Sequence, residues 1–268
     1  MVPPDAGRPS IPPRSPTSLD PAAADELLRT GRLEVVGRLV AASNVTLLGR
    51  VTGAVPDRAE TGPSGTGVAA EALCVYKPIR GEAPLWDFPA GTLAHREVAA
   101  RLVSEATGWE IVPPTVLRDG PYGPGMVQLW LDVDPSLDVV ALIRANAPVL
   151  RPVVLFDAVV NNADRKAGHL LALPGGRIRG VDHGVCFSPE PKLRTVLWGF
   201  MDSPLEDDEL AVLGRLRAAL GGSLGAALAE MLAPDEVAAT ARRVERLLEE
   251  RRFPVPDPGW PAIPWPWY

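Results

Sequence analysis

The segment VVLFDAVVNNADRKAGHLLALPGGRIRGVDHG, residues 153–184, carries the strongest indication of the fold. An apolar stretch leads into a loop with charged side chains, and an apolar hairpin follows that loop. Ordering an irregular loop costs conformational entropy, and charges beside a buried segment lose hydration. We therefore expect a chemical purpose for the polar side chains of this loop, which are Asp164, Arg165, Lys166 and His169.

Two charged residues upstream of this segment lie in elements of regular structure. The run EALCVYKP, residues 71–78, is typical of a β-strand, and Lys77 lies near its end. The apolar periodicity of residues 92–108 predicts a helix with Thr92 at its N-cap, and this helix carries Glu97. The sequence therefore predicts a strand lysine followed by a helix glutamate.

The spacing of the later residues extends this order. Asp164 and His169 have the separation of the D-x-x-x-x-N motif, with histidine in the place of asparagine, and Asp182 begins an Asp-His-Gly turn after the hairpin. Protein kinases place a strand lysine, a helix glutamate, a catalytic aspartate and two metal ligands in this same order. Each residue alone is common on structural grounds, but the ordered set rarely arises by chance.

The chemistry of phosphoryl transfer explains why these residue types belong together. The reaction depends on positioning and charge neutralisation more than on covalent chemistry. A lysine such as Lys77 can fix phosphates as a point charge, and Glu97 can hold that lysine extended. Asp164 can orient or deprotonate an acceptor hydroxyl. His169 and Asp182, at the two ends of one hairpin, can clamp a divalent ion against the phosphates.

Three segments resemble the phosphatidylinositol 3-/4-kinase superfamily, in particular its type II phosphatidylinositol 4-kinase branch and the bacterial relatives of that branch. CVYKPIRGEAPL (74–85) resembles the nucleotide-binding strand, FDAVVNNADRKAGHLL (156–171) the catalytic loop, and IRGVDHGVCF (178–187) the metal-binding turn. The resemblance covers roughly residues 33–200. It implies an atypical kinase fold with ATP in a cleft between two lobes.

The resemblance also implies a role for each matched residue. Lys77 would bind phosphate with Glu97 as its partner, and Asp164 would be the catalytic aspartate. His169 and Asp182 would hold Mg²⁺ or Mn²⁺. Because neutral imidazole suits softer divalent ions better than Mg²⁺, the histidine indicates either tolerance of Mn²⁺ or weakened activity. Otherwise His169 is a hydrogen-bonded residue of the hairpin.

The remaining nucleotide contacts are expected from two other places. By the resemblance, Leu129 and Trp130 lie near the hinge that meets adenine. The chain lacks a G-x-G-x-x-G motif, so the turn AASNVTLLG (41–49) is either an ordinary hairpin turn or a phosphate cover. Successive backbone amides in a turn can bind phosphate. In that case they would act together with the side chains of Ser43, Asn44 and Thr46.

The layout of the chain predicts an α+β fold, a two-lobed atypical protein-kinase-like fold with a β-rich N-lobe and a mainly helical C-lobe. We expect a disordered leader (1–25), a nucleotide-binding N-lobe (26–128), a helical C-lobe with the catalytic loop and the metal-binding hairpin (129–253), and a Pro/Trp tail (254–268). Strands are expected at 33–41, 44–52, 71–78 and 126–133, and helices at 92–108, 136–147, 150–160, 204–220, 223–232 and 234–252.

Composition excludes several classes of function. The net charge of −6 argues against a general binder of nucleic acid or anionic membranes, since phosphates attract Lys and Arg. Two cysteines make no disulfide framework, and we saw no secretory signal, so a reducing cytoplasm is the expected setting. No uncharged apolar run approaches the roughly 18 residues that would span a bilayer.

The acceptor is less well defined than the fold. Lipid kinases of the superfamily bind anionic headgroups with basic residues after the metal turn, and here only Lys192 and Arg194 follow it, beside Glu190. No polybasic run marks a membrane-docking surface. A protein serine or threonine, or a small hydroxyl compound, is therefore at least as well supported as a lipid.

Three further features have a structural and a functional interpretation. Asp157 is expected to orient the catalytic loop by hydrogen bonding, while Arg165 either forms a salt bridge within the loop or contacts the γ-phosphate. The tail FPVPDPGWPAIPWPWY (253–268) either packs its aromatic rings into a groove of the helical lobe, which we favour, or is a polyproline-type ligand for a protein partner.

The leading hypothesis is an ATP-dependent phosphotransferase that moves the γ-phosphoryl group to a hydroxyl acceptor. A nucleotide-binding pseudokinase that acts as a scaffold or regulator is the alternative, motivated by the histidine and the absent glycine-rich loop. A metal-dependent hydrolase is the third hypothesis, and it leaves Lys77 and Glu97 unexplained. It would use Asp164, His169, Asp182 and His183.

Overall fold

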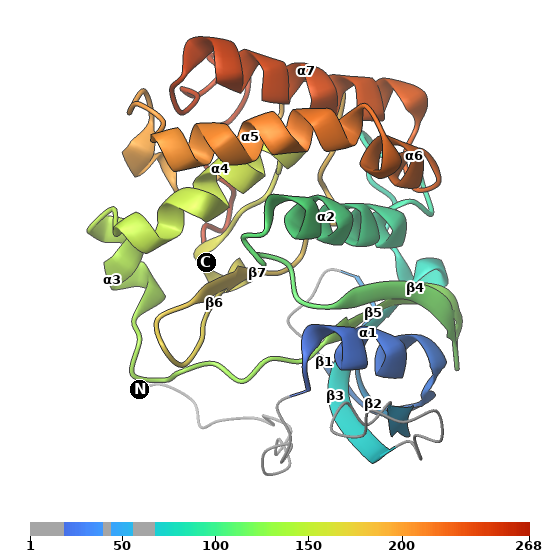
Figure 1. Ribbon diagram of the computed structural model, residues 1–268. Helices are drawn as coiled ribbons and strands as arrows, with labels where there is room; N and C mark the ends of the chain where they lie inside the picture. Colours follow the sequence, from blue (N-terminus) through green and yellow to red (C-terminus); the bar gives the residue numbers. More distant parts are fainter. Residues whose placement is uncertain (1–18, 40–43, 56–67) are drawn as a thin grey trace, which may run out of the picture.

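The computed structural model describes residues 19–39, 44–55 and 68–268, and it has two lobes (Figure 1). One lobe contains a five-stranded antiparallel sheet in the order β1-β2-β3-β5-β4, and the other consists mainly of helices. The expected α+β class is confirmed, and the arrangement is consistent with a two-lobed kinase-like fold. The sheet comprises β1 (Arg32–Leu39), β2 (Thr46–Val55), β3 (Val68–Pro78), β4 (Thr115–Gly120) and β5 (Gly123–Leu129).

The central strand β3 determines where Lys77 points. Successive side chains of a strand face opposite sides of the sheet. Cys74 and Tyr76 are buried on the face that packs against α1 (Pro21–Thr30). Lys77, the next residue along, therefore faces the other side, where α2 (Leu93–Thr107) lies.

Helix α1 corrects the expected leader of residues 1–25. Asp20 caps the helix by accepting hydrogen bonds from two backbone amides at 3.0 Å, and Pro21 occupies the first turn. Leu27 and Leu28 are buried against the sheet. An Asp-Pro pair is a favourable start for a helix. The Pro- and Ala-rich composition of the surrounding residues instead indicates disorder, so the sequence does not predict this helix. Residues 1–18 lie outside the part of the chain that the structure describes.

Two differences from the expected strands lie near the end of the sheet. The strand expected over 126–133 begins earlier and ends sooner, because β5 forms a hairpin with β4 and leaves the sheet after Leu129. Strand β4 itself was not predicted. Its sequence TVLRDG has little apolar alternation, so only its pairing with β5 makes it a strand.

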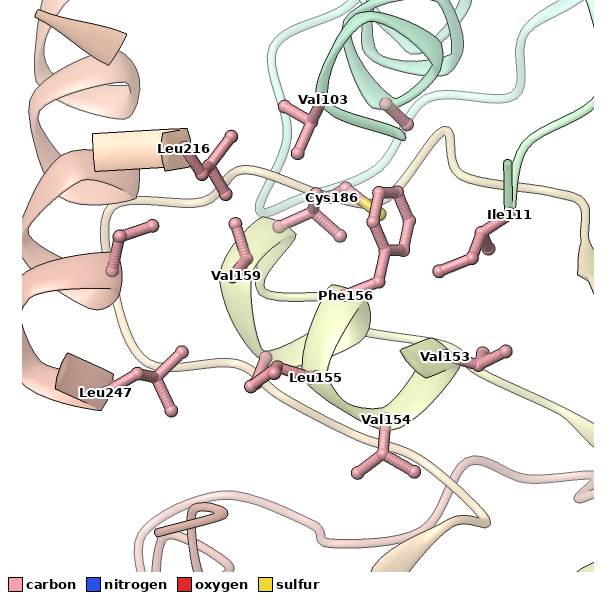
Figure 2. Packing of buried hydrophobic residues seen from close by; sticks show 14 of the residues in the cluster. Val103, Ile111, Val153, Val154, Leu155, Phe156, Val159, Cys186, Leu216 and Leu247 are labelled. Carbon is pink, nitrogen blue, oxygen red and sulfur yellow. The ribbon is translucent and has the colours of Figure 1, made fainter. Parts of the chain in front are cut away.

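The helical lobe forms around α4 (Arg151–Val160), which is buried from Val153 to Val160. Figure 2 shows Val103 of α2, Leu216 of α5 (Asp207–Leu220) and Leu247 of α7 (Pro234–Glu250) around this helix. A helix that is apolar on all sides belongs in the interior of a protein. The lobe comprises α3 (Val139–Arg144), α4 (Arg151–Val160), α5 (Asp207–Leu220), α6 (Ser223–Ala229), α7 (Pro234–Glu250) and the hairpin of β6 (Leu170–Ala172) and β7 (Ile178–Gly180).

Helix α2 lies between the sheet and the helical lobe (Figure 1), and it contacts both. A buried ion pair joins its Arg96 to Glu236 of α7, and the same guanidinium donates to the carbonyl oxygen of Cys186 at 2.7 Å. The helix is therefore attached to the C-lobe as well as to β4 and β5. Among the described residues, no helix has the length and apolar character needed to cross a membrane.

Both cysteines are free and fully buried, and this leads to a prediction about their reactivity. Burial is the main cause that raises the pKa of Cys74 to about 12 and raises that of Cys186 above its usual value. Because the thiolate is the reactive form, both thiols should resist alkylation in the native protein at pH 8. Mass spectrometry after maleimide treatment should show no label in buffer and two labels in urea. Rapid labelling of the native protein would contradict the packing described here.

Candidate active site

Three charged side chains from separate elements meet beside β3. Lys77 Nζ donates to Glu97 Oε1 at 2.7 Å and to Asp182 Oδ1 at 2.8 Å. Glu97 is buried, and its second oxygen accepts a hydrogen bond from the backbone amide of His183 at 2.8 Å. The helix glutamate therefore holds both the strand lysine and the turn that follows β7. The structure brings together three residues that lie up to 105 positions apart in the sequence.

Helix α2 is held in place for this contact by an acidic residue that follows Lys77. The carboxylate of Glu82 accepts from the backbone amides of Leu93 and Ala94 at 3.2 and 2.9 Å, which satisfies the start of the helix. Thr92 occupies the N-cap position as expected, but its hydroxyl donates to the carbonyl oxygen of Pro89 instead of capping the helix. The cap is thus supplied from outside the helix.

The charges in this cluster stabilise one another. Burial opposes the charged form of Lys77, but Asp182 and Glu97 outweigh it and raise the pKa of the ammonium above its usual value. In turn, the Lys77 ammonium holds the pKa of the Asp182 carboxyl below its usual range. Lys77 and Asp182 are therefore both charged at neutral pH.

The hairpin of β6 and β7 brings His169 to Asp182. His169 ends the short helix η3 (Ala167–His169), and its Nε2 lies 3.4 Å from Asp182 Oδ2. Burial lowers the pKa of His169, so the imidazole is neutral at pH 7 and can donate a lone pair. Within the described ranges no group of three or more His, Cys, Asp or Glu side chains could hold a metal ion. His169 and Asp182 are therefore a pair of side chains and not such a group.

Asp164 lies in the same loop between two cations. Its Oδ2 accepts from Lys166 Nζ at 2.7 Å, and its Oδ1 lies 3.5 Å from Arg194 Nη2. The carboxylate is partly exposed, with 23% of its side chain accessible, so it can be reached by another molecule. We had not expected Lys166 or Arg194 to contact Asp164. The position of Lys166 two residues after the aspartate could have indicated the first contact.

Asp157 holds the loop at residues 161–169 by hydrogen bonds, as expected. Arg165 Nε and Nη2 donate to its two carboxylate oxygens at 2.8 Å each, and Asn162 Nδ2 donates to Oδ1 at 3.0 Å. The prediction that Asp157 orients the loop by hydrogen bonding is confirmed. Arg165 is fully buried and forms a salt bridge, but its partner Asp157 lies in α4, and not within the loop as the sequence interpretation had it.

His183 connects this pair to the lysine cluster. Its Nε2 lies 2.7 Å from Arg165 Nη2, and since a guanidinium only donates, Nε2 accepts and Nδ1 carries the proton. Nδ1 lies 4.0 Å from Glu97 Oε2. Burial holds the pKa of His183 well below its usual value, so the ring is neutral. Polar contacts therefore run from Asp157 through Arg165 to the His183 ring, and the backbone amide of His183 continues them to Glu97 at 2.8 Å, while Nδ1 has no hydrogen-bond partner in the described part of the chain.

The residues expected to contact phosphate are only partly brought together. Asn44 lines a cavity of about 20 Å³ with Lys77, Glu97 and Asp182, and its Oδ1 accepts from the backbone amide of Ala83 at 2.7 Å. Thr46 is buried, and its hydroxyl donates to the carbonyl oxygen of Asn44, so it is not brought to the cavity. Ser43 lies outside the described residues.

The two expected hinge residues lie further along the sheet. Lys77 pairs with Met126 and Cys74 with Leu129, so Leu129 is three residues from the strand position opposite the lysine, or roughly 10 Å. Leu129 and Trp130 are both partly buried, and the amide of Trp130 donates to the carbonyl oxygen of Leu73. They therefore lie at the point where the chain leaves the sheet for the helical lobe.

Breaking the buried Asp157–Arg165 ion pair should strongly reduce the stability of the protein. Arg165→Met leaves Asp157 as an unpaired buried charge, so we expect the free energy of unfolding to fall by about 3–5 kcal/mol in a urea titration. The double variant Asp157→Leu/Arg165→Met should recover much of that loss, because neither charge remains.

A surface pair provides the control for this experiment. Arg32 and Glu34 lie 3.0 Å apart with 79% and 51% of their side chains exposed, so Arg32→Ala should cost less than about 1 kcal/mol. If Arg165→Met cost no more than Arg32→Ala, the buried pair would not be what orders the loop.

Comparison with known proteins places the chain in a family. No protein-family model matches it. The solved structure of the Helicobacter pylori proinflammatory kinase CtkA gives a TM-score of 0.46 at 10% identity, over 84% of this chain and 94% of that one. Protein Rv2133c of Mycobacterium tuberculosis is 41% identical over 276 aligned residues, which cover 90% of this chain and 94% of that protein. At this identity over most of both proteins, the chain belongs to the same family as Rv2133c.

Proposed function

We propose that the protein is a kinase, an ATP-dependent phosphotransferase that moves the γ-phosphoryl group to a hydroxyl acceptor and is related to the phosphatidylinositol 3-/4-kinases. The observation that carries this proposal is the convergence of Lys77 from the sheet, Glu97 from α2 and Asp182 from the turn after β7. His169 and Asp164 lie on the loop beside them. A lysine held by a glutamate, next to an aspartate that can bind a metal ion, is an arrangement that suits a nucleoside triphosphate.

The N-lobe residues would bind the phosphates. Lys77 would contact them while Glu97 keeps the ammonium in place. A divalent ion, Mg²⁺ or Mn²⁺, would be held by His169 and Asp182 and would neutralise phosphate charge. A carboxylate and a neutral imidazole are suitable ligands, and phosphate oxygens and water would complete the coordination. The cavity of about 20 Å³ holds about one water molecule, so Lys77 and Asp182 must separate when phosphate enters.

Asp164 would orient or deprotonate the acceptor hydroxyl. In the structure its charge is balanced by Lys166 and Arg194. Lys166 would be free to turn towards the transferred phosphoryl group when an acceptor hydroxyl approaches Asp164. We propose a protein serine or threonine, or a small hydroxyl compound, as acceptor in preference to a lipid. The region after the metal turn contributes only Lys192 and Arg194, and Lys192 is already paired with Asp87 at 2.9 Å.

The first test separates nucleotide binding from transfer. Asp164→Asn should reduce ATP consumption at least about 100-fold, since it removes a general base, while the rise in melting temperature with ATP and Mn²⁺ should persist. Lys77→Met should abolish that rise. Asp119→Asn, at the exposed end of β4, is the matched control and should behave as wild type. Transfer at the wild-type rate by Asp164→Asn would overturn the role of Asp164.

A second candidate function, a nucleotide-binding pseudokinase, is favoured by one specific observation. His169 stands where kinases have a metal-binding asparagine, beside a Lys77–Asp182 pair that closes the phosphate cavity. Metal-dependent ATP binding without turnover, across a broad set of acceptors, would support this candidate. Measurable phosphoryl transfer would exclude it.

The presence of His169 also leads to a prediction about the metal preference of the protein. Because neutral imidazole favours Mn²⁺ over Mg²⁺ compared with an amide oxygen, His169→Asn should lower the ratio of activity with Mn²⁺ to activity with Mg²⁺. The ratio is measured by ATP consumption at matched metal concentrations. The same ratio in wild type and variant would show that His169 does not contact the metal.

A further inference from the structure

The Pro/Trp tail is docked beside the catalytic loop, and its contacts exceed those expected of a tail that packs into a groove. The favoured interpretation of the sequence was aromatic packing on the helical lobe. In the structure, Trp265 is 87% exposed and Trp267 is 42% exposed, so these rings contribute little packing. Backbone hydrogen bonds and one aromatic ring, Trp260, attach the segment instead.

Trp260 belongs to a cage of aromatic rings around a buried cation. The Nζ of Lys192 lies 5.1 Å from the ring centre of Trp86, 5.3 Å from that of Phe88 and 5.2 Å from that of Trp260. Only 4% of the Lys192 side chain is exposed, and its charge is paired with Asp87. Cation–π contacts gain strength when the cation is desolvated.

This cage joins three distant parts of the chain. Trp86, Asp87 and Phe88 lie in the loop between β3 and α2, the loop that also caps α2 through Glu82. Lys192 lies in the helical lobe and Trp260 in the tail. The tail is therefore linked to the N-lobe through one cation, Lys192, which the loop at residues 86–88 and Trp260 surround.

The tail also pairs with the segment that supports the catalytic loop. The carbonyl oxygen of Ala262 accepts from the amide of Thr195 at 3.0 Å and from Trp198 Nε1 at 2.7 Å. On its other side this segment pairs with the loop, since the amide of Arg165 donates to the carbonyl oxygen of Arg194 at 3.0 Å and Arg194 Nε donates to that of Ala163 at 2.7 Å.

A direct hydrogen bond completes the attachment. The amide of Ala167, the first residue of η3, donates to the carbonyl oxygen of Trp267 at 2.9 Å. Two residues later η3 ends at His169, the candidate metal ligand. Three residues before Ala167 lies Asp164, the candidate base. The tail therefore holds the short stretch of backbone between the two groups.

We propose that residues 260–267 form a clamp that positions the catalytic loop and couples it to the N-lobe loop at residues 86–88. This inference rests on the proposed function, because it assigns the tail to the acceptor side of the same site. The clamp holds the loop mainly through backbone hydrogen bonds, so Trp260 and Trp267 are positioning residues. They do not contact the reacting atoms. A chain without the clamp would keep Lys77 and Glu97 but would lose the fixed relation of Asp164 to His169.

Two substitutions remove single hydrogen bonds of the clamp. Ala167→Pro removes the amide that donates to Trp267. Proline suits the first position of a helical turn, and the preceding Lys166 has φ −93° and ψ 160°, which a residue before proline readily adopts. Trp198→Phe removes the indole N–H that donates to Ala262. Trp109→Phe makes the same change at a tryptophan outside the clamp and is the control.

Hydrogen exchange followed by mass spectrometry tests the clamp on the full chain, with no nucleotide present. In Ala167→Pro and Trp198→Phe, amides of residues 161–169 should exchange about fivefold faster or more, the factor expected from losing one hydrogen bond. Trp109→Phe should leave that region unchanged. If neither clamp variant changes exchange in this region, the clamp does not hold the loop.

Steady-state kinetics then separates positioning from general stability. With Mn²⁺ and ATP, both clamp variants should lower kcat while the KM for ATP changes less than about twofold, because the Lys77–Glu97 pair does not touch the tail. Faster exchange with an unchanged kcat would overturn the positioning role. If wild type itself consumes no ATP, the proposed function fails, and the exchange experiment still decides whether the clamp exists.

Discussion

The carboxylate of Glu97 is the point on which the arrangement of this protein depends. It is buried, so its charge must be fully paired, and its two oxygens go to Lys77 in the sheet and to the backbone of His183 in the helical lobe. Removing Lys77 would leave the buried carboxylate without its cation. The pairing requires α2 to lie between the lobes, which the Glu82 cap and the Arg96–Glu236 ion pair secure from opposite sides.

The buried polar groups next to Glu97 connect the two lobes. Asp157 and Arg165 pair beneath the loop at residues 161–169, the His183 ring contacts Arg165, and the backbone amide of His183 donates to Glu97. Because each of these groups is buried, a shift of one requires compensation by the next. The lysine cluster and the loop that carries Asp164 are thus built on one buried support. The tail adds a second connection between the lobes, beside the loop that carries Asp164, through the cage around Lys192.

Much of the candidate site could be predicted because its residues occur in a characteristic order. The strand lysine, the helix glutamate, the D-x-x-x-x-H spacing and the Asp-His-Gly turn are all local patterns, and the structure brings Lys77, Glu97, His169 and Asp182 together. Thr46, predicted to contact phosphate, is buried and donates to the carbonyl oxygen of Asn44, because local sequence does not determine which face of a strand a residue takes near a turn. Lys166 and Arg194 were overlooked because their contacts with Asp164 depend on side-chain direction.

By itself, the sequence determined the α+β class, the extent of most helices and strands, and the identity of the charged residues that meet. These follow from periodicity, caps and spacing, which act over a few residues. Only the tertiary structure decided that TVLRDG is a strand, that Asp20 begins a helix, that Glu82 caps α2 and that the tail lies on the catalytic loop. Each of these needs a partner that is distant in the chain or a buried surface to pack against, and no local pattern encodes that partner.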